Sequence, residues 1–242
     1  MRRELAEPTE RLLRYLEAKD DILLITTSNR YEAHGWDTAK STELAGRVKE
    51  RLEETKKRVT LLDAAKLKIY TCEGNVSAGR GNNCGVPDAK VEDPVKNPTG
   101  SLRCWASVNH PDDQLHEVSR ALFRSSSVIF FASMRWGQTN SVYQRLFERL
   151  TWIENRVTTL GEPPISELQE LEAGMVLFGH NWNTEQVLRT QKQNYEWFGW
   201  KTPEALSFAW QHTDEDDESR ESYQGAIDEF RSFLPVVFPR RS

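Results

Sequence analysis

The sequence predicts an α/β protein, a three-layer α/β/α sandwich around a five-stranded parallel sheet. Two observations lead to this prediction. Short apolar runs recur along the chain, and the segments between them repeat their apolar residues with the period of a helix. Runs that are apolar at every position indicate strands buried on both faces, and strands that alternate with helices indicate a parallel sheet with right-handed crossovers.

Five apolar runs are expected to form the strands. The first, at 22–27, is aliphatic and ends in two threonines, and the third, at 128–132, reads VIFFA. β-Branched and aromatic residues of this kind favour a strand over a short buried helix. The other three strands are expected at 59–62, 175–178 and 205–210.

The intervening segments are expected to be helices. At 38–57, Leu44, Val48 and Leu52 lie on one helical face, and at 140–157 a longer apolar stripe is followed by glycine and proline, which end a helix. Further helices are expected at 115–123, 184–198 and 223–234, and an amphipathic helix at 2–19 precedes the first strand.

One domain carries most of the chain. We expect residues 1–20 to form a helical extension and residues 21–238 to form the domain, with an insertion at 64–111. The insertion has little periodicity, many glycines, asparagines and prolines, and all three cysteines. Because long irregular insertions are usually functional or mobile, we expect this one to form a lid over the active site.

Charge and composition exclude some partners and locations. The formal charge is −5, and acidic and basic residues are interleaved, which argues against nucleic acid or an anionic membrane as the main partner. The first residues lack the apolar core of a signal peptide, and no run of about 18 apolar residues is present to span a bilayer. We therefore expect a cytoplasmic protein that contacts neither a membrane nor nucleic acid.

The loop after the first strand is a candidate phosphate site. It contains Ser28 and Arg30, and Thr38 and Ala39 follow at the start of a helix. Hydroxyls, a guanidinium and free amides at a helix N-terminus suit a phosphate monoester, although Arg30 also fits a simple surface role. Because neither a Walker nor a Gly-x-Gly-x-x-Gly spacing is present, a mononucleotide fits better than a dinucleotide.

The loop after the third strand carries a resemblance to a known family. It contains Trp136 and Gly137, and Glu148 and Arg149 lie late in the following helix. This arrangement resembles the NADPH-dependent FMN reductases of the flavodoxin-like superfamily, which have Pro-x-Tyr-Trp-Gly-Ser-x-Ser after the third strand and Asp-Arg in the next helix. The first loop is similar too, with Ser-x-Arg at 28–30 and Asp-Thr-Ala at 37–39 where the family has Asn-Thr-Ala.

The resemblance implies a site for FMN and a reaction. NADPH or NADH would reduce the flavin, which would pass electrons to a small-molecule acceptor such as a quinone or flavin, in a homodimer or homotetramer. The phosphate would be held by Ser28, Arg30, Thr38 and Ala39. The isoalloxazine would be lined by Ser133, Met134, Arg135, Trp136, Gly137 and Gln138, and by His180, Asn181 and Trp182 after the fourth strand. Ser133 stands where the family has proline, and Arg135 stands where it has tyrosine.

The cysteines of the insertion have several possible roles. The segment around Cys72 and Cys84 is similar to the insertion of iron–sulfur flavoproteins, but three cysteines cannot supply the four ligands of such a cluster within one chain. A zinc site completed by His110 or His116, a redox pair, and plain buried or substrate-lining thiols all remain open.

Two other functions also fit the sequence. A flavodoxin-type electron carrier would bind FMN without turning over a nicotinamide, and a redox-responsive binding protein would use the thiols without catalysis. The large insertion and the absence of Thr-Gly-Asn-Thr after the first strand distinguish this chain from such carriers.

Overall fold

A parallel sheet forms the middle layer of the protein. The computed structural model describes residues 5–29, 38–75, 82–179, 182–213, 217 and 219–239. Five strands lie in the order β2-β1-β3-β5-β6, and every neighbouring pair is parallel. Their bounds are β1 Asp21–Thr26, β2 Arg58–Asp63, β3 Ser127–Arg135, β5 Glu172–Gly179 and β6 Phe208–Gln211. The short β4, Gln138–Thr139, pairs antiparallel with the end of β3.

The strand order fixes where a ligand can bind. From β1 the chain goes to β2 on one side and then crosses to β3 on the other. The connections therefore diverge at the carboxyl ends of β1 and β3, which is the switch point where open α/β sheets bind their ligands. This order is that of flavodoxin-like folds, so the predicted fold class is confirmed.

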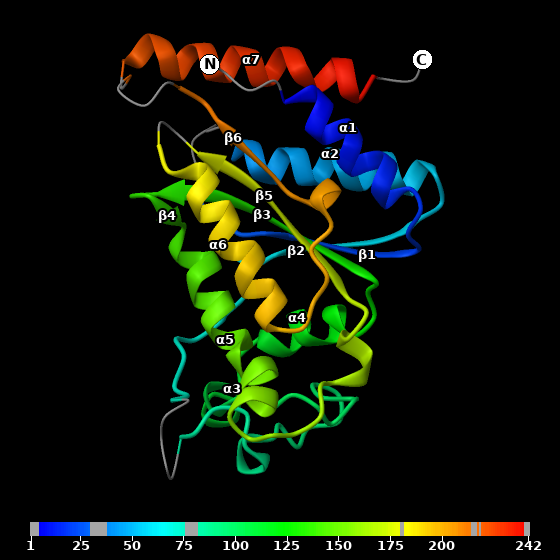
Figure 1. Cartoon of the computed structure of the whole chain (residues 1–242), viewed down its shortest axis with the longest axis vertical. Helices are drawn as coiled ribbons and strands as arrows, with labels where there is room; N and C mark the ends of the chain where they lie inside the picture. The colour runs from blue at the N-terminus through cyan, green and yellow to red at the C-terminus, as the bar shows by residue number, and fades with distance from the viewer. Residues whose placement is uncertain are drawn as a thin grey trace.

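Helices cover both faces of the sheet (Figure 1). One outer layer contains α1 Ala6–Leu16, α2 Lys40–Glu54 and α7 Arg220–Val237, and the other contains α4 Leu115–Leu122, α5 Ser141–Thr158 and α6 Thr184–Trp197. The insertion holds the short α3, Trp105–Asn109, and lies beside the far end of α5 at the bottom of Figure 1. Single 3-10 turns occur at η1 Pro87–Ala89, η2 Ser166–Leu168 and η3 Glu204–Leu206.

The core is divided by the sheet into two clusters. Within β1, Ile22 and Leu24 face α1, α2 and α7, whereas Leu23 and Ile25 face the opposite layer. All four side chains are at most 1% exposed. The unbroken apolar run of this strand therefore follows from burial on both faces.

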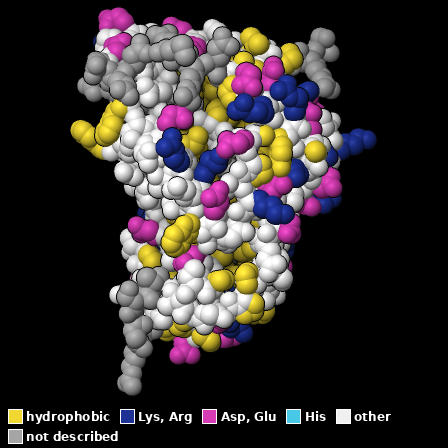
Figure 2. Space-filling view, in the orientation of Figure 1, with side chains coloured by type: hydrophobic (Ala, Val, Ile, Leu, Met, Phe, Trp, Pro, Cys, Tyr) yellow, Lys and Arg dark blue, Asp and Glu magenta, His cyan; other side chains and the backbone are white. Residues whose placement is uncertain are grey.

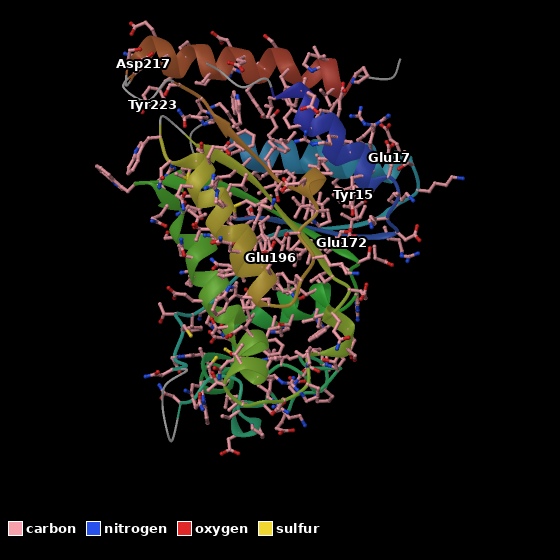
Figure 3. All side chains as sticks on the ribbon, in the orientation of Figure 1. Tyr15, Glu17, Glu172, Glu196, Asp217 and Tyr223 are labelled. Carbon is pink, nitrogen blue, oxygen red and sulfur yellow. The ribbon has the colours of Figure 1, made fainter. Side chains whose placement is uncertain are left out.

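The N-terminal helix is part of this core. Leu12 and Leu16 of α1 are fully buried and join the cluster that includes α2 and α7. At the C-terminal end of the helix, the Tyr15 hydroxyl donates to Glu172 at 3.0 Å, and the Lys19 ammonium just beyond it donates to the same carboxylate at 2.9 Å (Figure 3). The segment predicted as an extension is thus fastened to the start of β5.

Some element boundaries differ from the sequence prediction. The last strand begins at Phe208 rather than at 205, because η3 takes up Leu206, which is buried as a turn residue. The final helix begins at Arg220 rather than at 223, and Ser219 caps it by accepting a hydrogen bond from the Ser222 amide. Serine is favoured at this position because it satisfies an amide that has no partner within the helix.

The surface bears mixed charge. Figure 2 shows basic and acidic side chains interleaved on the visible face. Within the described ranges, the helices are either too short or too polar to cross a membrane.

Candidate functional site

A cavity of about 310 Å³ opens at the carboxyl ends of β1 and β3. Four parts of the chain line it: the loop after β1 with the start of α2, the end of β3, the end of β5, and the residue after β6 with the first turn of α7. The lining residues are Ser28, Asn29, Ala39, Lys40, Ser41, Ser133, Met134, Arg135, Phe178, Gly179, His212 and Tyr223. The cavity therefore lies at the switch point.

One end of the cavity is built by the start of α2. The hydroxyls of Ser28 and Ser41 form a hydrogen bond of 2.7 Å, which links the loop after β1 to the first turn of the helix. The N-cap residue, Ala39, has no side chain that could satisfy the first-turn amides. The Thr42 hydroxyl in the same turn is buried and has no hydrogen-bond partner. Unsatisfied donors at a helix N-terminus are suited to an anion.

The predicted phosphate residues are only partly brought together. Ser28 and Ala39 line this cavity, whereas Thr38 is exposed and lines a neighbouring one. Arg30 lies outside the described residues. Lys40 and Ser41, which were not in the predicted set, complete this end of the cavity.

The cavity is also bordered by the first strand of a hairpin, through Met134 and Arg135. Met134 pairs with Thr139 and Arg135 with Gln138, so that Trp136 and Gly137 form a two-residue turn. Both turn residues have positive φ, 49° for Trp136 and 70° for Gly137, as a type I′ turn requires. Glycine adopts this conformation freely, but tryptophan does so at a cost of roughly 1–2 kcal/mol.

The hairpin contacts the loop after β5. The ring of Trp182 lies against Gly137, where a Cβ atom would come within 2.5 Å of it. The Asn183 side chain donates to the Gly137 carbonyl at 2.8 Å. Trp182 remains 49% exposed and Trp136 95% exposed, so both indoles are accessible beside the cavity. The other two residues predicted here, His180 and Asn181, lie outside the described residues.

Asn140 fixes the relative positions of the strand ends. Its side-chain oxygen accepts from the Tyr143 amide at 2.9 Å and caps α5. Its amide group donates to the Ser133 hydroxyl at 3.0 Å and to the Thr27 hydroxyl at 3.3 Å. Ser133, which stands where the resembled family has proline, thus supplies a hydrogen-bond acceptor that ties the end of β3 to α5 and to the residue after β1.

Of the residues predicted to line the isoalloxazine, three border the cavity. Ser133, Met134 and Arg135 are lining residues, and Arg135 donates back to the Met134 carbonyl at 3.0 Å. Trp136, Gly137, Gln138 and Trp182 belong to the adjoining hairpin and loop but are not lining residues.

The sequence prediction also missed five further lining residues, Asn29, Phe178, Gly179, His212 and Tyr223. His212 follows β6, with its ring centroid 4.4 Å from that of Trp210 and 6.0 Å from that of Phe178. Tyr223 lies on the first turn of α7, beside the end of β6 (Figure 3). Their places after the last strand and at the start of the last helix were the available signal, because every parallel strand of the sheet ends at this edge.

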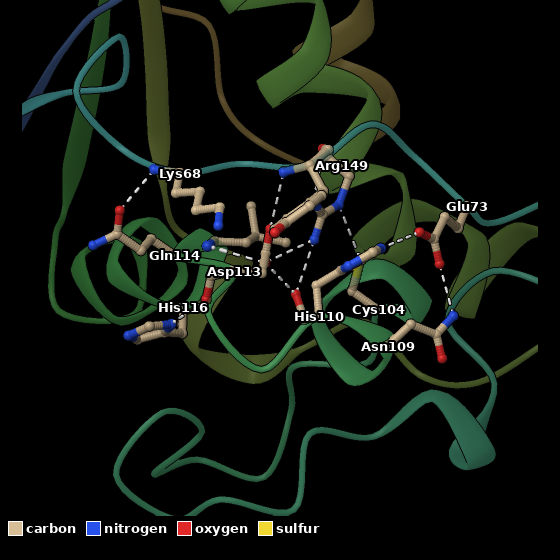
Figure 4. A network of polar contacts seen from close by, with 12 residues as sticks. Lys68, Glu73, Cys104, Asn109, His110, Asp113, Gln114, His116 and Arg149 are labelled. Carbon is tan, nitrogen blue, oxygen red and sulfur yellow. Dashed lines mark hydrogen bonds and ion pairs between the residues drawn. The ribbon is translucent and has the colours of Figure 1, made fainter.

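Arg149, matched above to the family's Asp-Arg motif, does not border the cavity. It forms a fully buried ion pair with Asp113, with two contacts of 2.9 Å (Figure 4). The guanidinium also donates to the Tyr70 carbonyl, the Ser107 hydroxyl and the Cys104 sulfur. Burial acts to raise the pKa of Asp113, but the hydrogen bonds and charge of Arg149 outweigh it, so this pKa lies below its ordinary value.

The described residues of the insertion pack beside α5 and not over the cavity. Asn155 of α5 donates to the Cys84 carbonyl, and Trp105 donates to the Asn83 carbonyl at 2.9 Å. None of the described residues of the insertion lines the cavity. For this part of the segment, the prediction of a lid within one chain is wrong.

The three cysteines are free thiols. Burial raises the pKa of Cys84 to about 12 and also raises that of Cys72 above its ordinary value. His110 pairs with Glu73 at 2.5 Å, and the His116 ring bonds the Asp113 carbonyl at 3.0 Å. Within the part of the chain that the structure describes, no group of three histidine, cysteine or acidic side chains is arranged to hold a metal.

Comparison with known proteins places the chain by fold alone. No family model and no curated protein matches it. The structure of RosB with the bound intermediate 8-demethyl-8-formylriboflavin-5'-phosphate is similar, with a TM-score of 0.56 and 10% identity over 90% of this chain and 75% of RosB. The azoreductase AzrA has a TM-score of 0.51 and 10% identity over 90% of this chain and all 100% of AzrA.

Proposed function

We propose that this protein is a flavin-dependent oxidoreductase that holds FMN at the switch-point cavity and transfers hydride from NADPH or NADH to a small-molecule acceptor. The observation that carries the proposal is the chemistry of the groups at the cavity. The start of α2 presents hydroxyls and uncapped helix amides to an anion, and the hairpin after β3 and the loop after β5 place accessible indoles next to the cavity. A riboflavin phosphate needs both environments in one cavity.

The residues at the start of α2 would hold the phosphate. Ser28 and Ser41 offer hydroxyls, and the first turn of α2 offers backbone amides. These groups supply hydrogen bonds and a favourable helix dipole to a phosphate. RosB, which is similar in fold, is a structure with a bound riboflavin-5'-phosphate derivative, and AzrA, also similar in fold, is an azoreductase; both similarities support the proposal.

The hairpin and the segment after β6 would serve the isoalloxazine. Met134 and Phe178 give apolar contact, and Tyr223 offers a hydroxyl at the same cavity. The Arg135 guanidinium would stabilise the negative charge of a reduced flavin by Coulomb attraction. Bound FMN supplies the hydride chemistry, so the protein contributes orientation, electrostatics and exclusion of water.

The first test is spectroscopic. Purified protein supplemented with FMN is expected to retain the flavin through gel filtration, and anaerobic NADPH or NADH is expected to bleach its visible absorbance. Retention without bleaching would favour an electron carrier. Failure to retain flavin would refute the proposal.

A variant at the first turn of α2 gives this test its control. Ser41→Ala removes a hydroxyl proposed to contact the phosphate and is expected to weaken binding of FMN but not of riboflavin, which has no phosphate. Equal weakening of both ligands would show that Ser41 acts only through the fold.

We also propose that the protein is a cytoplasmic homodimer or homotetramer. Large apolar side chains are exposed at Trp136, Trp197 and Val236, at 95%, 73% and 68%. Exposed aromatic residues of this kind are enriched in subunit interfaces. Sedimentation velocity on the purified chain tests the proposal, and a monomer at all concentrations would contradict it.

A further inference from the structure

The insertion brings two thiols to one residue, Gly74. The Cys72 thiol donates to the Gly74 carbonyl at 3.9 Å. A Cβ atom built at Gly74 would lie 3.1 Å from the Cβ and 3.2 Å from the sulfur of Cys84, and its three nearest heavy atoms all belong to that cysteine. Because glycine has no side chain, the Cys84 thiol occupies the space beside it, and both sulfurs lie against the same residue.

Hydrogen bonds hold the two thiol-bearing segments side by side. The Asn75 amide donates to the Asn82 carbonyl at 2.8 Å, and the Asn82 side chain donates to the Glu73 carbonyl, also at 2.8 Å. Both bonds pair the segment that follows Cys72 with the segment that precedes Cys84. The closeness of the two cysteines is therefore set by the fold of the insertion and needs no contact between the sulfurs.

Cys84 is the fixed and buried member of the pair. It is 6% exposed, its carbonyl accepts from Asn155 of α5, and the carbonyl of Asn83 before it accepts from Trp105 at 2.9 Å. Cys72 is only partly buried. A reagent from solvent therefore reaches Cys72 first, whereas Cys84 is reached from within the protein.

The third cysteine has a different partner. The Cys104 sulfur is 5% exposed and accepts from Arg149 Nε at 3.2 Å, beside the buried ion pair of Arg149 with Asp113 (Figure 4). A bond from Cys104 to another thiol would take this acceptor away from the guanidinium, which is unfavourable for a buried donor. The pair that can form without such a loss is Cys72 with Cys84.

We propose that Cys72 and Cys84 form a reversible disulfide across Gly74, so that the insertion is a modification site for small-molecule disulfides. The Cys72 thiolate attacks the reagent and releases one thiol, and the Cys84 thiolate then attacks the Cys72 sulfur of the mixed disulfide and releases the second. The two protons lost by the cysteines go to the two released thiols, so one disulfide is reduced for the one that forms.

Two properties of the bond follow. Burial raises the pKa of both Cys72 and Cys84, so few thiolates are present near neutral pH and the exchange is slow. In a reducing compartment a disulfide of this kind is transient and acts as a redox sensor. The proposal does not depend on bound flavin, so a failure of the proposed function leaves its test unaffected.

The experiment counts thiols in the purified full chain. The protein is incubated anaerobically with 2-hydroxyethyl disulfide, unfolded in acid, alkylated and analysed by mass spectrometry and peptide mapping. Wild-type protein is expected to keep one of its three thiols, and Cys104→Ser none of its two, with Cys72 linked to Cys84 in both. Cys84→Ser should stop at a mixed disulfide on Cys72, and dithiothreitol should restore every thiol.

Gly74→Ala tests whether the two thiols meet at this glycine. The added methyl group would lie 3.2 Å from the Cys84 sulfur and displace it, so the disulfide should form roughly tenfold more slowly or worse. Gly46→Ala in α2 is the matched control, because a Cβ atom there meets nothing within 4 Å, and it should react at the wild-type rate.

Three results would overturn the inference. The first is a wild-type protein that keeps all three thiols or accumulates only the mixed disulfide on Cys72. The second is a peptide map that links Cys104 to either of the other cysteines. The third is a wild-type rate in Gly74→Ala. If Cys84→Ser does not fold, Cys104→Ser still decides the matter, because it retains both members of the pair.

Discussion

Removal of the Asp113 carboxylate is expected to destabilise the whole protein. Both side chains of the Asp113–Arg149 pair are 0% exposed. Asp113→Asn keeps the shape of the side chain but leaves the Arg149 charge without its counter-ion. Breaking a buried pair in this way costs about 3–5 kcal/mol, a large fraction of the ~5–15 kcal/mol that stabilises a typical domain.

The local contacts support the upper part of that range. The carboxylate of Asp113 accepts hydrogen bonds from the Tyr70 and Leu115 amides and from the Ser107 hydroxyl, at 3.1, 3.2 and 2.7 Å. An amide at position 113 would direct its NH₂ group at some of these donors. The substitution therefore disturbs the insertion, α5 and the start of α4 together.

The assay is urea unfolding followed by far-UV circular dichroism and tryptophan fluorescence. Glu7→Gln is the control, because it removes one carboxylate from an exposed pair with Arg11, at 64% and 43% exposure, and should leave the midpoint unchanged. A decrease no larger than that of Glu7→Gln would refute the reasoning, since it would mean that the buried charge is compensated by water or by another group.

The same pair predicts a pH dependence. The pKa of Asp113 in the folded protein lies below its ordinary value of 3.8, so the stabilisation is complete above the unfolded-state pKa and is lost as the pH falls through the folded-state pKa. The difference in stability between wild type and Asp113→Asn should therefore be constant near neutral pH and shrink in acid. A difference that grows below pH 3.8 would contradict this assignment.

Four further predictions concern the hairpin, the flavin and the thiols. Trp136→Gly should raise the thermal midpoint by relieving roughly 1 kcal/mol of backbone strain at φ 49°, because the exposed ring contributes little packing; a lower midpoint would show that the ring is packed in solution. Ser41→Ala should raise the dissociation constant of FMN roughly tenfold, the loss of one hydrogen bond to a charged group; calorimetry with riboflavin is the control. Arg135→Ala should lower the two-electron flavin midpoint potential by roughly 30 mV for each 1.4 kcal/mol of lost attraction, and an unchanged potential in a spectroelectrochemical titration would dismiss the role of this guanidinium. Cys84 should resist alkylation at about pH 8 in the folded protein, because burial raises its pKa to about 12; mass spectrometry after brief iodoacetamide treatment reports this, and rapid labelling would contradict it.

The fold was predictable because its strands are buried on both faces. The apolar runs at β1 and β3 can only be satisfied in the middle of a sandwich, and their alternation with helices leaves few topologies. The error at β6 has a local cause: Leu206 is as apolar as a strand residue, but it is buried by a 3-10 turn. Periodicity cannot separate these two kinds of burial over three residues.

The site was predictable only where local sequence determines it. The loops after β1 and β3 follow directly from strand order, and Ser28 and Met134 do line the cavity. His212 and Tyr223 enter from the other end of the chain, and Arg149 turns inward to Asp113, through contacts that no short segment encodes. The described part of the insertion was placed wrongly for the same reason, since its position depends on tertiary hydrogen bonds with α5.

The three contacts of Asn140 have a consequence for the strength of ligand binding. They fix the end of β3 against α5 and Thr27 within the protein itself, so an incoming ligand does not have to organise this side of the cavity. Ordering a rotamer-rich side chain on binding costs about 0.5–1.5 kcal/mol. Because Asn140 is already ordered in the folded protein, ligand binding does not include this cost. Affinity lost through Asn140→Ala should accordingly appear as an unfavourable binding entropy.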